Sequence, residues 1–216
     1  ASGTSDSAFG TNASASAENA TAIGAKAKAS EANATSIGTD AQASKARATA
    51  IGYEVRAVGK NAVAIGSSGE NSSRKLNSAG ENAVAIGTAA QANNLGSTAI
   101  GNLALAGNNN AIALGTSAEG TGESSTAIGK SAQAQKSDAI ALGTDTEASE
   151  ERAVAIGKGA NAEKVDAVAL GTSAISGGTR GVAIGNNAAA QEVDTIAIGS
   201  NAKAVQASDN AFGNGA

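Results

Sequence analysis

The sequence contains no cysteine, histidine, proline, methionine or tryptophan among its 216 residues. Without cysteine, the chain has no disulfide, thiol nucleophile or thiolate metal site. Without histidine, a Ser-His-Asp triad, an imidazole base and a His-ligated metal are all excluded. The Asp and Glu residues lack the Gly-Gly-x-Gly-x-Asp spacing of calcium-binding β-rolls and form no converging constellation. We therefore expect no enzymatic activity, no cofactor and no metal site.

Large apolar side chains are also scarce. Val, Ile, Leu and Phe together number 33, whereas Ala numbers 55 and Gly 28. So little side-chain volume cannot fill a conventional globular core. A net charge of only −4 and the absence of proline argue against a disordered chain, and the mild acidity argues against nucleic acid as a partner. The apolar runs, four or five residues long, are too short for direct membrane insertion, and no signal peptide begins the sequence.

A short apolar segment ending in Gly recurs along the whole chain. There are fifteen copies, and successive copies are fourteen positions apart except at one longer interval, from Gly66 to Gly87. The glycines are Gly10, Gly24, Gly38, Gly52, Gly66, Gly87, Gly101, Gly115, Gly129, Gly143, Gly157, Gly171, Gly185, Gly199 and Gly213. A fixed period of this length is typical of a solenoid, in which each repeat forms one coil.

Within each copy the side chains alternate with period 2, which predicts β-strands. Large apolar residues occupy one face of the strand before the Gly, and Ala or Ser occupies the other. A second alternation follows the Gly, as in Ala132-Gln133-Ala134, with small residues on one face and a polar residue on the other. The predicted fold class is therefore all-β: a parallel β-roll solenoid of about fifteen 14-residue coils with an alanine interior. We expect one repetitive domain over residues 1–216, with a loop insertion at about 67–80 in the long interval.

The large apolar side chains point away from the alanine interior and form a stripe along one sheet. At roughly 50 Å² for each of two side chains per coil, the stripe exposes about 1,500 Å², whereas monomers rarely expose more than a few hundred. Another copy of the chain is the simplest cover, and three-fold closure gives a compact apolar axis. The alternative, that the stripe faces an internal core, is less favoured because alanine already fills that role. The predicted intersubunit core consists of Ile23, Ile37, Ile51, Val63, Ile65, Val84, Ile86, Ile100, Ile112, Leu114, Ile128, Ile140, Leu142, Val154, Ile156, Val168, Leu170, Val182, Ile184, Ile196 and Ile198.

The run Asn61-Ala62-Val63-Ala64-Ile65-Gly66-Ser67, its regular recurrence and the second alternating strand resemble the YadA-like head of trimeric autotransporter adhesins. The resemblance extends from about Asp6 to Gly213. It implies a left-handed parallel β-roll in a parallel homotrimer, anchored to the bacterial outer membrane through a stalk and an anchor that lie outside this segment. In collagen-associated heads of the family a Ser commonly precedes the Val, but Ala62 and Ala83 hold that place here. The resemblance therefore does not extend to that collagen motif.

The leading hypothesis is a non-enzymatic adhesin head on the bacterial surface. Its partners would be a host extracellular-matrix or cell-surface ligand, or other copies in self-association between cells. A second hypothesis is a structural spacer that projects an adhesive tip elsewhere in the protein. A remote third is ice binding, because Thr21, Thr35 and Thr49 form a short ladder. The candidate ligand face is the polar outer side of the roll, represented by Lys28, Gln42, Arg56, Arg74, Lys75, Gln133 and Lys203.

Overall fold

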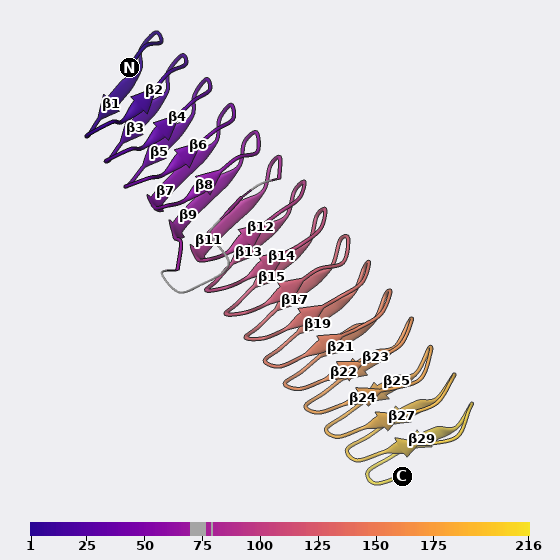
Figure 1. Ribbon diagram of the computed structural model, residues 1–216. Coiled ribbons are helices and arrows are strands. Elements are labelled where there is room, and N and C mark those ends of the chain that lie inside the picture. The colour runs from indigo at the N-terminus through magenta and orange to yellow at the C-terminus, as the bar shows by residue number, and fades with distance from the viewer. Residues whose placement is uncertain (70–76, 79) are drawn as a thin grey trace. The chain divides into compact units, whose positions relative to one another are not determined.

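The structure is a computed structural model that describes residues 1–69, 77–78 and 80–216, and it divides into two units, residues 1–110 and residues 111–216. The candidate residues Arg74 and Lys75 lie outside the described residues. Both units consist of short parallel strands that alternate between two sheets, so that successive coils stack on one another (Figure 1). No helix occurs among the described residues, and so none is long and apolar enough to cross a membrane.

In the unit of residues 1–110, odd-numbered strands form the first sheet and even-numbered strands form the second. The first sheet consists of β1 (Ser7–Phe9), β3 (Thr21–Ile23), β5 (Thr35–Ile37), β7 (Thr49–Tyr53), β9 (Val63–Ser67), β11 (Val84–Thr88) and β13 (Thr98–Ile100). The second sheet consists of β2 (Ser14–Ala15), β4 (Lys28–Ala29), β6 (Gln42–Ala43), β8 (Arg56–Ala57), β10 (Asn77–Ser78), β12 (Gln91–Ala92) and β14 (Leu105–Ala106).

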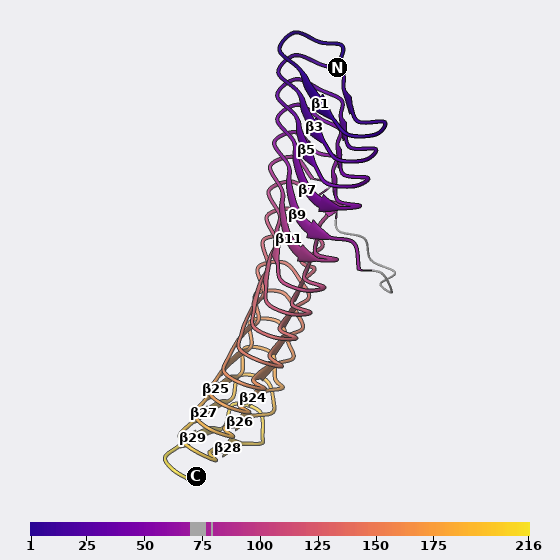
Figure 2. The same cartoon turned by 90° about the vertical axis from the view of Figure 1, so that its left-hand side faces the viewer.

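The unit of residues 111–216 repeats this arrangement, and Figure 2 shows β25, β27 and β29 on one side of its coils and β24, β26 and β28 on the other. Its first sheet consists of β15 (Ile112–Leu114), β17 (Thr126–Ile128), β19 (Ile140–Leu142), β21 (Val154–Ile156), β23 (Val168–Leu170), β25 (Val182–Ile184), β27 (Ile196–Ile198) and β29 (Asn210–Phe212). Its second sheet consists of β16 (Glu119–Gly120), β18 (Gln133–Ala134), β20 (Glu147–Ala148), β22 (Asn161–Ala162), β24 (Ile175–Ser176), β26 (Ala189–Ala190) and β28 (Lys203–Ala204).

The strands pair in parallel, and each residue lies beside its equivalent in the next coil. In β21 and β23, Val154 pairs with Val168 and Ile156 with Leu170. Across the long interval, Val63 pairs with Val84, so the stack continues in register in spite of the inserted residues. The predicted all-β parallel solenoid is confirmed. That residues 1–216 form a single head with an insertion at about 67–80 stays a prediction.

Alanine fills the interior of each coil, as the sequence predicts. In the coil that begins at β21, the side chains of Ala155, Ala160, Ala162 and Ala167 are completely buried. They come from both sheets and from both turns, so the two sheets meet through methyl groups. The backbone ladder between coils therefore supplies much of the order that large side chains supply in other folds.

The repeated glycine is required by both its backbone conformation and its surroundings. Gly157 has φ +129°, a conformation that residues with a side chain rarely adopt. A Cβ atom built on it would lie 2.5 Å from the carbonyl oxygen of Gly171 in the next coil. The same close approach recurs at the glycines of neighbouring coils. The glycine therefore allows the turns of successive coils to stack.

Two coils in the second unit replace a pair of buried alanines by one glycine and one serine. Gly120 lies next to Ser125, and Gly181 lies next to Ser176; a Cβ atom on Gly181 would lie only 2.7 Å from the Ser176 hydroxyl oxygen. That hydroxyl is buried and has no hydrogen-bond partner among the described residues. Each pair thus conserves the volume of the interior by enlarging one residue and reducing the other.

If Ser176 and Gly181 compensate each other in volume, a substitution at Ser176 should restore the stability that a substitution at Gly181 removes. Gly181→Ala should destabilise the fold by about 1–3 kcal/mol, because the new methyl group overlaps Ser176. Ser176→Ala/Gly181→Ala should recover at least wild-type stability, since it recreates the alanine pair of Ala162 and Ala167 and removes an unpaired buried hydroxyl. Urea unfolding followed by circular dichroism measures both variants. If the double variant is no more stable than Gly181→Ala, the obstacle is the carbonyl of Gly178, which lies 2.9 Å from the same Cβ position, and the volume argument is wrong.

Candidate interaction faces

The apolar stripe lies on the outer face of the first sheet in each unit. Every residue of the predicted intersubunit core occupies the first or third position of an odd-numbered strand, on the face opposite the alanine interior. Their side chains are half-buried or exposed: Ile23 is 40% exposed, and Ile100 and Ile156 are each 39% exposed. Aliphatic side chains in contiguous rows form a surface that gains free energy when a partner covers it.

The second sheet carries a row of mostly polar residues, which we name the outer row. Its members stand four positions after the repeated glycine, except in the long interval, where Asn77 takes this place between Arg56 and Gln91. In the first unit, Lys28, Gln42 and Arg56 occupy consecutive strands of this row; Lys28 pairs with Gln42, and Gln42 with Arg56. Lys28 and Arg56 are exposed, and Gln42 is half-buried. These three of the predicted ligand-face residues are therefore brought together.

In the second unit the predicted residues of the outer row are not adjacent. Gln133 lies in β18 between Glu119 and Glu147, whereas Lys203 lies in β28 beside Ala189. The amide nitrogen of Gln135 donates hydrogen bonds to Gln133 Oε1 at 3.1 Å and to Glu147 Oε1 at 2.9 Å. The polar groups around Gln133 therefore satisfy one another within the chain.

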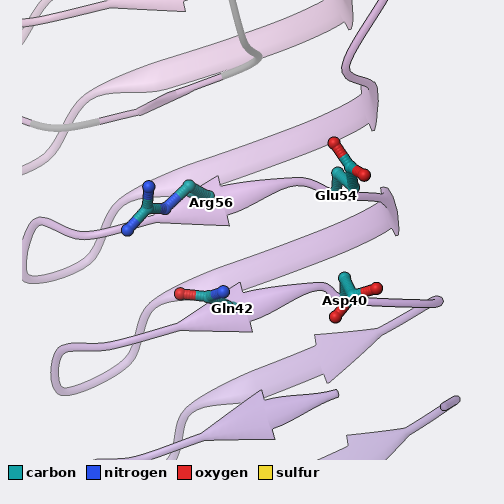
Figure 3. A pocket seen from close by; sticks show the side chains of 4 residues that line it. All are labelled: Asp40, Gln42, Glu54 and Arg56. Atoms are coloured by element: carbon teal, nitrogen blue, oxygen red, sulfur yellow. The ribbon is translucent and has the colours of Figure 1, made fainter. Parts of the chain in front are cut away.

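A shallow hollow of about 300 Å³ lies beside the outer row of the first unit. It is lined by Asp40, Gln42, Glu54 and Arg56. Figure 3 shows Asp40 and Glu54 one above the other at one side, and Gln42 and Arg56 one above the other at the other side. The hollow therefore has one rim of carboxylates and one rim with an amide and a guanidinium.

The model of the YadA head domain repeat matches this chain at residues 1–27, 29–54, 78–104, 92–118, 121–146, 134–160, 148–174, 162–188 and 176–202. These matches cover well over half of the sequence. The chain belongs to the YadA head family. The family resemblance of the sequence is thereby confirmed.

One solved structure similar to this YadA head is the crystal structure of the collagen-binding domain of the Yersinia adhesin YadA. The two are 19% identical, the match covers 97% of this chain and 81% of the other, and the TM-score is 0.24. No curated protein matches this chain.

In the second unit of this YadA head, five consecutive coils carry a charged residue in the turn before the first-sheet strand, nine positions after the repeated glycine. We name this set the turn row; it consists of Asp138, Arg152, Asp166, Arg180 and Asp194. Arg152 donates hydrogen bonds to Asp166 from Nε at 2.6 Å and from Nη2 at 3.0 Å, and Arg180 donates to Asp194 at 2.6 and 2.7 Å. These hydrogen bonds hold the pKa of Asp166 and of Asp194 below the ordinary value and raise the pKa of Arg152 and of Arg180. Alternating charges therefore pair successive coils along this edge.

The lowered pKa values of Asp166 and Asp194 determine whether acid raises or lowers the stability of the fold. A carboxyl group whose pKa is lower in the folded chain stabilises the fold above its unfolded pKa, and that contribution is lost as the pH falls through the folded pKa. Acidification from pH 7 to pH 2 should therefore lower the urea midpoint of the wild type more than that of Asp166→Asn/Asp194→Asn. The difference should be small, because both pairs are exposed, and should shrink in 1 M NaCl. If the urea midpoints of the two proteins fall by the same amount between pH 7 and pH 2, the ion pairs of Asp166 and Asp194 do not stabilise the fold.

Sequence reasoning missed the carboxylate rim of the hollow. The predicted ligand face includes Gln42 and Arg56 but neither Asp40 nor Glu54. The available signal is their separation: they are one repeat apart, so in-register stacking places them in adjacent coils. Residues 55–77, which include Arg56 and the first part of the long interval, lie outside the ranges that match the YadA head model. The hollow therefore borders the part of the first unit that departs from the family pattern.

Proposed function

We propose that this YadA head is a non-enzymatic bacterial surface adhesin. It acts as a parallel homotrimer of left-handed β-rolls, displayed outside the cell by an outer-membrane anchor. The observation that carries the proposal is the half-exposed aliphatic stripe on the sheet face opposite a completely filled alanine interior. Since the interior needs no further packing, the stripe is available for another chain.

A closed ring of identical chains fits the stripe better than an unlike partner. The aliphatic positions repeat coil by coil, as in Val154, Val168 and Val182, so parallel copies bring equivalent residues to the same level. Three copies around one axis bury the apolar stripe of each chain. The second sheet of each chain then lies at the periphery of the trimer. The trimer would then present three outer rows to its surroundings.

The peripheral face supports adhesion. In the first unit it displays Lys28, Gln42 and Arg56 in consecutive strands, and the hollow lies beside them. The proposed ligands are components of the extracellular matrix or of host cell surfaces, or other bacteria. Three copies of each weak contact per trimer would add avidity to binding.

The test uses the purified chain. Its mass is measured by light scattering on a size-exclusion column, and its attachment to immobilised matrix proteins and to host cells is measured at the same concentration. The proposal expects a mass near three times 20.4 kDa and saturable attachment. A trimer that binds neither matrix nor cells, while the intact surface protein binds, would instead support the spacer. A folded 20.4 kDa monomer would contradict the trimeric core.

A further inference from the structure

The outer row contains two sets of three residues in which a glutamine lies between two like charges. In each set the three residues occupy consecutive strands of the second sheet and pair in register. In the first unit this set, which we name the basic triplet, consists of Lys28, Gln42 and Arg56. In the second unit it has the opposite sign, and this acidic triplet consists of Glu119, Gln133 and Glu147.

The charges of the two triplets have the same spacing. All six residues belong to strands, and each charged residue is two strands away from the other charged residue of its triplet. Neighbouring strands of a sheet lie about 4.8 Å apart, so the two charges of each triplet are about 10 Å apart. When the triplets face one another, a single register therefore aligns both cations with both carboxylates. Because each triplet has the same order in both directions, this holds for parallel and for antiparallel chains.

The cations of the basic triplet are available to a partner. Lys28 and Arg56 are exposed, and neither side chain forms an ion pair or a hydrogen bond with another of the described residues. Figure 3 shows the Arg56 side chain directed away from the carboxylates of Asp40 and Glu54. An ammonium and a guanidinium group displayed in this way can make charge-assisted hydrogen bonds to carboxylates of another molecule.

In the acidic triplet, the printed contacts of Glu147 are with neutral donors. Its Oε1 atom accepts hydrogen bonds from the Gln135 amide at 2.9 Å and from the Ser149 hydroxyl at 3.1 Å. No lysine or arginine in the described part of the chain forms an ion pair with Glu147. The two hydrogen bonds orient the carboxylate but leave its charge uncompensated, so a cation of a partner can still pair with it.

A second copy of this chain fits both triplets at once. The spacing of about 10 Å is set by the distance between coils, and another β-roll has the same distance between its coils. The second copy also supplies both signs of charge, a basic triplet for the acidic one and an acidic triplet for the basic one. Complementary charge with matched spacing is what steers two protein surfaces into one register.

We propose that the basic triplet of one copy binds the acidic triplet of a second copy. The inference rests on the proposed function, which places the second sheets at the periphery of the trimer, and it names a partner of the outer row. Each contact between two copies leaves one triplet of either sign unused, so association can continue beyond two particles. Pairs of exposed charges bind weakly, and the three copies in each particle add avidity.

The test is the clustering of fluorescent beads that carry the purified chain, in 50 mM NaCl. Lys28→Glu/Arg56→Glu converts the basic triplet into a second acidic one, and Glu119→Lys/Glu147→Lys converts the acidic triplet into a second basic one. Wild-type beads should cluster, and beads with either variant alone should cluster at least about tenfold less, because only like charges can then meet. In 500 mM NaCl the wild-type beads should also stay dispersed.

A mixture of the two variants separates complementary binding from a loss of folding. Beads with two acidic triplets and beads with two basic triplets, labelled with different dyes, should cluster with each other through contacts between unlike colours. The variant with all four substitutions exchanges the positions of the two triplets and should cluster like the wild type. A misfolded protein would recover in neither experiment.

Lys130→Glu/Lys158→Glu is the matched control for net charge. Both lysines are exposed, directly follow a repeated glycine and are two coils apart, so this variant changes the net charge and its spacing as Lys28→Glu/Arg56→Glu does. Its beads should cluster like those of the wild type. Circular dichroism and light scattering of every variant should match the wild type, because the substituted side chains lie outside both the interior and the apolar stripe.

Several results would overturn the proposal. The first is a mixture of the two variants that stays dispersed, and the second is a control variant that clusters as poorly as Lys28→Glu/Arg56→Glu. If Glu119→Lys/Glu147→Lys clusters like the wild type, the basic triplet binds some other surface. Wild-type beads that stay dispersed, although the trimer attaches to matrix proteins and to cells, refute this inference alone. A folded monomer that attaches to neither refutes the proposed function, whether or not the mixed beads cluster.

Discussion

Replacement of Gly157 by alanine is expected to destabilise the fold by about 3 kcal/mol or more, through strain and overlap together. The alanine must adopt φ +129°, and its methyl group would lie 2.5 Å from the oxygen and 2.6 Å from the carbon of the Gly171 carbonyl. Those atoms belong to the backbone, so no side chain can move aside. Relief requires two coils to separate, which breaks the hydrogen-bonded ladder on both sheets.

The same coil offers a matched control. Gly159 has φ +63°, and a Cβ atom there would meet only the Ser173 hydroxyl, at 3.8 Å. Asn187 and Asn201 occupy the equivalent turn position with φ of 54° and 59°. Gly159→Asn should therefore leave the urea midpoint nearly unchanged, whereas Gly157→Ala should lower it strongly. Similar midpoints for the two variants would show that the close approach of the glycine backbones does not limit stability.

The repeat made most of the fold predictable. The regularly spaced glycine, with Ile, Leu or Phe directly before it and usually Ala two positions before it, specifies which face of each strand is internal. Parallel in-register stacking then follows, because equivalent residues can meet only if each coil is displaced by one strand spacing. The alanine interior and the outward aliphatic rows were both deduced in this way.

The details that sequence reasoning missed arise from single coils. Besides the repeated glycine, each turn has a further residue in the left-handed conformation, such as Asp40 at φ 55° and Arg47 at φ 57°. Asn, Asp and Ser are frequent there, but Lys, Arg and Leu also occur, so the residue type alone is a weak signal. The hollow was missed because it depends on which polar side chains of two adjacent coils line one depression of the surface. A periodic pattern cannot show that for one coil.

Introduction of charge into the apolar stripe is expected to reduce the mass of the particle from three chains to one. Val154 and Ile156 point outward from β21, and Ile156 is 39% exposed in the single chain. Val154→Glu/Ile156→Glu should therefore lower the free energy of unfolding of the single chain only slightly. In the proposed trimer the same positions are buried, and three pairs of carboxylates would meet around one axis. Desolvation and like-charge repulsion then disfavour association by several kcal/mol.

Ile175→Glu is the control that distinguishes assembly from general surface hydrophobicity. Ile175 is 41% exposed, almost the same as Ile156, but it lies in β24 on the outer face of the second sheet. Its replacement should leave a mass near three times 20.4 kDa by light scattering, whereas the stripe variant should give a folded 20.4 kDa monomer. If both variants dissociate, both sheets take part in assembly. If neither does, the stripe is not the intersubunit core, and the peripheral placement of the second sheet, on which the adhesive proposal depends, is lost with it.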